Sequence, residues 1–206
     1  MKRIGLAIGL CLGFATTLLV ANVAQAQLLE QPRGRQGYWL GVAVGGAGAT
    51  LAEDKKGTRF LSGNGFTLRL GELVTQRLGL GLLLEWSSIK SGGDQGGVGM
   101  LGVEGSYNPW RNLSVKTAAG FGVIMLTDQN TEEKKLRGGA GATISLGAAY
   151  DFYPWRNRLT GGWALTPTVD ARYMPDGNIH GLTVLAGLQV TYWSGLQRNQ
   201  LILPEE

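Results

Sequence analysis

The chain has 206 residues, with 34 glycines, one cysteine and one histidine. Its 19 basic and 15 acidic residues give a net charge of +4, too mild a basicity to predict nucleic-acid binding. After residue 26, no apolar run approaches the ~20 residues that a spanning helix needs. One cysteine and one histidine predict neither a disulfide framework nor a transition-metal site, and we expect no cofactor.

Residues 1–26 have the pattern of a secretory signal peptide. Lys2 and Arg3 form a positive start, and the following residues 4–20 are apolar and uncharged. Ala24 and Ala26 are the small residues that a signal peptidase reads, which predicts cleavage before Gln27. An uncleaved anchor is less favoured because no basic stop-transfer flank follows. We expect export through the Sec pathway and a mature chain without cysteine.

Eight segments of alternating apolar and polar residues follow. In 159–173, the odd positions are mostly apolar and the even positions mostly small or polar. Successive side chains of a strand point to opposite faces, so each segment predicts a strand with one apolar face. The eight predicted strands are 37–50, 64–73, 76–87, 97–107, 113–126, 138–153, 159–173 and 181–193.

The connections between these strands alternate in kind. Residues 51–63, 88–96, 127–137 and 175–180 are charged or glycine-rich, whereas 74–75, 108–112 and 154–158 are short. Short turns on the periplasmic side and longer loops outside are typical of outer-membrane barrels. Aromatic residues beside the strand ends suit a girdle at the membrane boundary, and we assign it to Tyr38, Tyr107, Trp110, Tyr153, Trp155 and Tyr192.

On this pattern, residues 37–193 resemble the small eight-stranded outer-membrane proteins of the OmpA-domain and OmpX type. The resemblance implies an all-β, up-and-down antiparallel transmembrane barrel. It also implies a last strand read by the barrel-assembly machinery, here Leu182, Val184, Leu188, Val190 and Tyr192. Residues 27–36 would be a periplasmic segment, and 194–206 a short tail. We expect a monomer in contact with outer-membrane lipids and lipopolysaccharide.

The rival architecture is a soluble lipocalin-like barrel, which is apolar inside and polar outside. A soluble surface carries about 25–35% charged residues. The polar faces of the predicted strands fall well short of that and are filled by Gly, Ala, Ser and Thr. This composition favours a barrel with its apolar face toward lipid.

Inward charges must find partners in so narrow a lumen, because an unpaired buried ion costs several kcal/mol. If Tyr107 pairs with Leu113, Glu104 lies opposite Lys116. We predict a lumen ion network in the periplasmic half formed by Arg69, Glu104, Lys116 and Asp151, with a second pair, Asp170 and Arg172, nearer the outer rim. The network is either a structural plug or a gate. Pro167, in the middle of a strand, predicts a bulge.

The sequence offers little catalytic chemistry. His180 lacks the neighbouring serine that lipid A-modifying barrel enzymes use, and a His–Asp pair with Asp176 is not a triad. We therefore expect a non-enzymatic barrel with a structural or surface-interaction role in the cell envelope. The alternative is a narrow pore, or a passage protein for small hydrophobic molecules similar to the OmpW type.

Overall fold

The computed structural model describes residues 37–53, 57–75, 77–110, 112–128, 136–154, 162–175 and 179–194. The predicted signal peptide, the segment 27–36 and the tail beyond residue 194 lie outside these ranges. The strands are β1 (Tyr38–Glu53), β2 (Gly57–Leu73), β3 (Leu78–Ser91), β4 (Asp94–Tyr107), β5 (Leu113–Asp128), β6 (Leu136–Tyr150), β7 (Gly162–Met174) and β8 (Ile179–Trp193).

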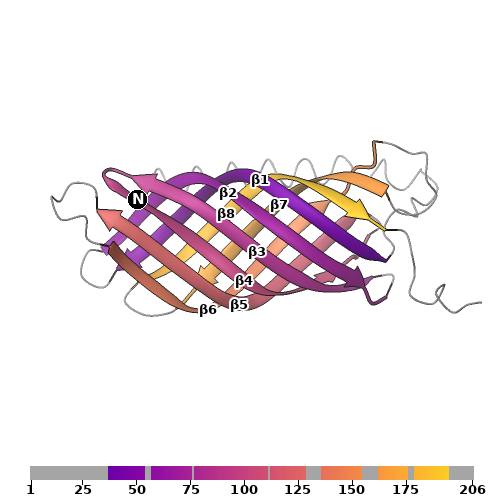
Figure 1. Cartoon of the computed structure of the whole chain (residues 1–206), viewed down its shortest axis with the longest axis horizontal. Helices are drawn as coiled ribbons and strands as arrows, with labels where there is room; N and C mark the ends of the chain where they lie inside the picture. The colour runs from indigo at the N-terminus through magenta and orange to yellow at the C-terminus, as the bar shows by residue number, and fades with distance from the viewer. Residues whose placement is uncertain are drawn as a thin grey trace, which may run out of the picture. The chain divides into compact units, whose positions relative to one another are not determined.

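The eight strands form one closed antiparallel barrel (Figure 1). Each strand pairs with its neighbours in sequence, and β1 closes the sheet on β8 from Trp39–Trp193 to Glu53–Ile179. In the described ranges, no helix has the length and apolar character needed to cross a bilayer. We call the end where β1 begins and β8 ends the terminal end, and the opposite end the distal end.

The two faces of the barrel wall differ as the alternation predicts. On β1, Tyr38, Leu40 and Val42 are about half exposed on the outside, whereas Trp39 and Ala43 are buried in the lumen. The same apolar outward face recurs on the other strands, and the buried inward positions include most of the charged side chains in the strands. This arrangement is that of a barrel solvated by lipid, and the lipocalin-like alternative is wrong.

Strands are longer at the distal end than the sequence predicts. The β1–β2 pairing continues to Glu53 and Gly57, so most of the predicted loop 51–63 is strand. The predicted loop 88–96 is reduced to Gly92 and Gly93, because Ser91 already pairs with Asp94. Both glycines have positive φ, 53° and 108°, which a two-residue hairpin turn requires and which other residues rarely adopt.

The bulge predicted at Pro167 is absent. The β7–β8 register is continuous through the Pro167–Leu188 pair. On its other side, β7 pairs regularly with β6 only from Thr168 to Tyr173, and an isolated bridge joins Leu165 to Phe152. Proline has no N–H to donate to a ladder. It therefore lies at the point where the β6–β7 ladder is interrupted, and no extra residue is inserted.

Candidate functional site in the barrel lumen

Aromatic side chains close the terminal end of the lumen. The rings of Trp39 and Trp193 pack with their centroids 6.1 Å apart, and Ala164, Leu73 and Tyr153 pack against them. Tyr153 is thus part of this aromatic lid. Its hydroxyl donates to Asp151 over 3.3 Å. The expected lipid-facing role of Tyr153 in the girdle is therefore wrong, since its ring packs on lumen residues.

Arg69 is the centre of the polar layer above this lid. The guanidinium extends from β2 and forms an ion pair of 2.8 Å with Glu104 on β4 and another of 2.8 Å with Asp170 on β7. It also donates to the side-chain oxygen of Gln189 on β8, at 2.9 Å. Arg69, Glu104 and Asp170 are all almost completely buried. One side chain thus joins four strands across the lumen, a planar donor arrangement that lysine cannot supply.

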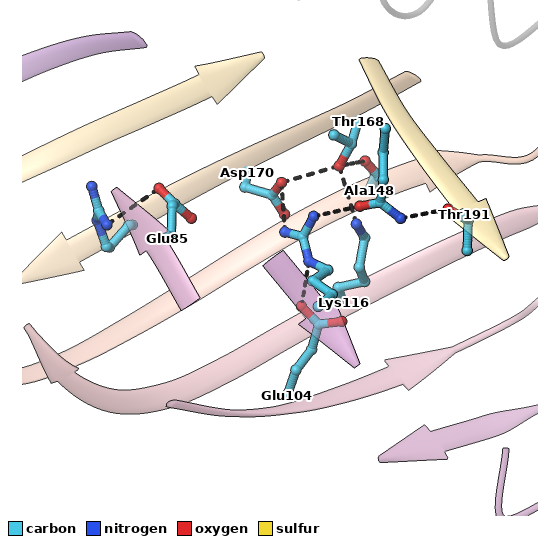
Figure 2. A network of polar contacts seen from close by, with 10 residues as sticks. Glu85, Glu104, Lys116, Ala148, Thr168, Asp170 and Thr191 are labelled. Atoms are coloured by element: carbon cyan, nitrogen blue, oxygen red, sulfur yellow. Dashed lines mark hydrogen bonds and ion pairs between the residues drawn. The ribbon is translucent and has the colours of Figure 1, made fainter. Parts of the chain in front are cut away.

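Lys116 and Asp151 extend this layer on the β5–β7 side. The Lys116 ammonium donates to the Thr168 hydroxyl at 3.1 Å, and Thr168 donates to Asp170 at 3.0 Å. Figure 2 shows Lys116, Thr168 and Asp170 grouped around the same point of the lumen. Asp151 accepts a hydrogen bond of 2.7 Å from Thr166. The structure therefore brings Arg69, Glu104, Lys116 and Asp151 into one polar layer together with Asp170.

The pair predicted between Asp170 and Arg172 is not formed. Asp170 binds Arg69, and Arg172 forms an ion pair of 3.2 Å with Glu85 on β3. Residues two apart on a strand are separated by nearly 7 Å along it, so each reaches a partner across the lumen more easily. The predicted network did not include Glu85. Because Leu84 faces outward and successive residues of a strand alternate, Glu85 is expected to face inward, as it does.

The register behind the predicted network is also wrong. Tyr107 pairs with Val115 and not with Leu113, so Glu104 lies opposite Ala118 and Lys116 lies opposite Ser106. The turn between β4 and β5 is therefore asymmetric, and the sequence around Pro109 does not show this. Because the shift is two residues, both charged side chains keep their inward orientation.

The distal half of the lumen is filled by an apolar core. Its members are buried and come from seven strands: Ala47, Ala49, Leu51, Leu61, Ile89, Val98, Ile124, Leu126, Met174, Ile179 and Leu185. Beyond this core, Asp94 forms ion pairs with Arg59 from β2 and with Arg137 from β6, the latter at 2.9 Å. This layer was not predicted from the sequence, because Leu51, Leu61, Ile89 and Ile179 fell in the predicted connections 51–63, 88–96 and 175–180.

Little space remains between these layers. A cavity of about 30 Å³ lies among Arg69, Glu104, Lys116 and Asp151, next to the aromatic lid. That volume is enough for one or two water molecules and too small for a solute. Among the residues that the structure describes, no three His, Cys, Asp or Glu side chains are grouped as metal ligands. Chemically, the layer can bind water and hold strands together.

The remaining predicted site residues that the structure describes lie on the outside of the barrel. Tyr38, Tyr107, Trp110 and Tyr192 are exposed near the terminal end, and Trp155 lies outside the described residues. The five residues assigned to the assembly signal, from Leu182 to Tyr192, all face outward on β8. Their part in assembly stays a prediction. His180 is half-buried at the distal end of β8, where it pairs with Ala52.

The hydrogen bond between Thr166 and Asp151 gives a first testable prediction. Thr166→Val keeps the shape of the side chain and removes the 2.7 Å bond to the buried carboxylate. We expect the free energy of unfolding to fall by about 1–3 kcal/mol, the usual cost of a lost buried bond to a charged group. Urea unfolding in lipid vesicles measures it. Thr117→Val, on the lipid face, is the matched control, and equal midpoints for the two variants would contradict the prediction.

Comparison with known proteins supports the same architecture. No family model and no curated sequence matches the chain. The structure of Ail, the attachment invasion locus protein of Yersinia pestis, is similar with a TM-score of 0.52 at 12% identity, covering 76% of this chain and 99% of Ail. Neisserial surface protein A is similar with a TM-score of 0.51 at 12% identity, covering 77% and 98%. The chain has the fold of the small eight-stranded outer-membrane β-barrels.

Proposed function

We propose that this protein is a closed, non-enzymatic barrel of the Gram-negative outer membrane, with a structural or surface-interaction role in the cell envelope. The proposal includes Sec-dependent export with removal of residues 1–26, insertion by the barrel-assembly machinery and a monomeric state. The fold that this chain shares with the similar structures supports the proposed cellular role.

The continuous packing of the lumen is the observation that supports this proposal best. From the terminal to the distal end, the lumen holds an aromatic lid, a polar layer around Arg69, an apolar core and the Arg59–Asp94–Arg137 group. An eight-stranded barrel is just wide enough for side chains to fill. A conducting path would have to displace Trp39, Leu61 and Ile89, among other buried residues. The plug is therefore favoured over the gate.

A passage function for small hydrophobic molecules is the second candidate. Its best support is the apolar character of the distal lumen around Leu61, Ile124 and Leu185. These side chains are buried against one another, so they form a core and leave no channel at this level. Passage would require the core to open. We therefore rank this function below the structural role.

The experiment has two parts, and both use the unmodified protein. Outer-membrane fractions are compared on SDS gels with and without boiling, and we expect a folded barrel that shifts on heating. The purified protein is then placed in a planar lipid bilayer, where we expect no discrete conductance steps at neutral pH. Porin-like steps would overturn the closed-lumen proposal, and recovery in the soluble fraction without a heat shift would overturn the location.

A further inference from the structure

Three rows of outward residues cross β1, β2 and β3 near the outer boundary of the apolar band. The register pairs Val44 with Phe66 and Phe66 with Trp86 in the first row. The second row is Gly46, Asn64 and Ser88, and the third is Gly48, Ser62 and Lys90. Moving toward the distal end, the wall thus changes from large apolar residues, to small hydrogen-bonding residues, to a cation.

A groove runs along this part of the wall. Its volume is about 530 Å³, and it is bordered by Val44, Phe66, Trp86, Asn64 and Ser88. At Gly46, an added Cβ would meet no atom within 4 Å, so the space in front of this glycine is open.

Glycines also fix the position of Trp86. A Cβ at Gly99 would lie 2.6 Å from the Trp86 ring, and a Cβ at Gly97 would overlap the same ring. The indole therefore lies flat on the wall of β4, held by close contact with two residues that lack side chains. The groove is bordered on this side by an aromatic ring in a defined position.

The polar groups beside the groove are available for an external partner. No side-chain hydrogen bond joins Asn64 or Ser88 to another described residue, and both are exposed. Strands tilted by roughly 40° rise about 2.5 Å per residue along the axis of such a barrel. The ten-residue step from Leu78 to Ser88 therefore covers about 25 Å, the height of the apolar band. Counted from Leu78, Ser88 and its partner Asn64 lie at this height, Lys90 lies beyond it, and the exposed Phe60 lies one row further as a boundary aromatic.

We propose that this groove binds lipopolysaccharide through its phosphorylated lipid anchor. One acyl chain would lie over Val44, Phe66 and Trp86 and reach the open space in front of Gly46. Asn64 and Ser88 would hydrogen-bond the amide and hydroxyl groups where the chains join the sugar, and Lys90 would pair with a phosphate. Along the lipid, acyl chains are followed by amide and hydroxyl groups and then by phosphate. Along the wall, apolar residues are followed by small polar residues and then by a cation, in the same order. The site rests on the proposed outer-membrane location, since the distal end must face the leaflet that holds this glycolipid.

The test uses the protein purified from outer membranes into detergent micelles and titrated with bisphosphoryl lipid A. Native mass spectrometry gives the fraction of barrels that hold one lipid. Gly46→Leu places a side chain in the open space beside the groove, where its Cβ meets no atom within 4 Å, and we expect apparent affinity to fall about tenfold. Lys90→Gln is expected to weaken binding about fivefold, since a lysine at an anionic surface contributes about 1 kcal/mol. With dephosphorylated lipid A, Lys90→Gln should have no effect.

Two control variants make comparable changes elsewhere on the outside of the barrel. Ala140→Leu enlarges an outward residue on β6, and Arg77→Gln removes an exposed cation at the terminal end. Both should bind lipid A like the unmodified protein. Unchanged affinity in Gly46→Leu and Lys90→Gln, or equal affinity for phosphatidylethanolamine, would overturn the proposal. If the unmodified protein forms a dimer and Gly46→Leu does not, a second copy of the chain occupies the groove, and the lipid proposal is overturned.

The heat shift and the membrane location of each variant separate the two proposals. If the variants remain heat-modifiable in the outer-membrane fraction and bind lipid A normally, the groove assignment fails and the closed-barrel proposal stands. If the unmodified protein is absent from that fraction, the proposed function fails first, and the glycolipid proposal fails with it.

Discussion

Replacing Arg69 by methionine is expected to lower the free energy of unfolding by about 3–5 kcal/mol. The substitution keeps most of the buried volume and removes the only cation that pairs with both Glu104 and Asp170 in the described network. Both carboxylates are almost completely buried, so they would be left with uncompensated charge. The measurement is urea unfolding in lipid vesicles, followed by tryptophan fluorescence and by loss of the SDS-resistant band.

Two further variants show whether the cost comes from charge. Arg77→Met removes an exposed arginine and should change the free energy of unfolding by less than about 0.5 kcal/mol. The triple variant Arg69→Met, Glu104→Gln and Asp170→Asn removes the two stranded charges, and it should recover much of the stability. If Arg69→Met alone unfolds at the same urea concentration as the unmodified protein, the network does not hold the barrel together.

Gly45→Ala and its neighbour Gly46→Ala are expected to behave in opposite ways. Gly45 faces inward where β1 closes on β8, and an added Cβ would overlap the carbonyl oxygen of Ala186 and lie 2.6 Å from the Gly187 Cα. Both contacts are with backbone, which a rotamer change cannot relieve. We expect Gly45→Ala to lose about 3 kcal/mol or more and to fold with low yield.

Gly46→Ala is the matched control one residue away. Its Cβ would point outward into open space, so no contact opposes it. Alanine restricts the unfolded chain more than glycine does, and we expect a gain of about 0.5–1 kcal/mol. The fraction of SDS-resistant band after refolding measures both variants. Equal folding yields for Gly45→Ala and Gly46→Ala would mean that the two strands are not held as closely as the structure shows.

Much of the architecture could be predicted from the residues alone. A strand repeats every two residues, so the outward Leu80, Leu82 and Leu84 place Leu83 and Glu85 inside, whatever their partners are. The same parity gave Arg69, Glu104, Lys116 and Asp170 as lumen residues. Eight such segments after a predicted signal peptide leave a closed barrel as the structure that satisfies every backbone group in lipid.

The choice of partners could not be predicted in this way. The alternation of residues gives the face on which each side chain lies. It does not give the relative heights of side chains on different strands along the barrel axis, because these depend on the stagger with which the barrel closes. The sequence thus predicted a pair between Asp170 and Arg172, whereas the closed barrel pairs Asp170 with Arg69 and Arg172 with Glu85. It also assigned Tyr153 to the lipid boundary, whereas the ring packs against the lumen cluster of Trp39, Ala164 and Trp193.

The distal apolar core was not predicted from the sequence either. Leu61 and Ile89 lie at inward positions of β2 and β3, whereas the sequence placed them in the connections 51–63 and 88–96, where no face was predicted. The sequence by itself determined the eight strands and which residues of each strand face inward, because a strand repeats every two residues. Only the tertiary structure decided which charges meet and how side chains fill the lumen, because both depend on side chains that converge from strands far apart in the chain.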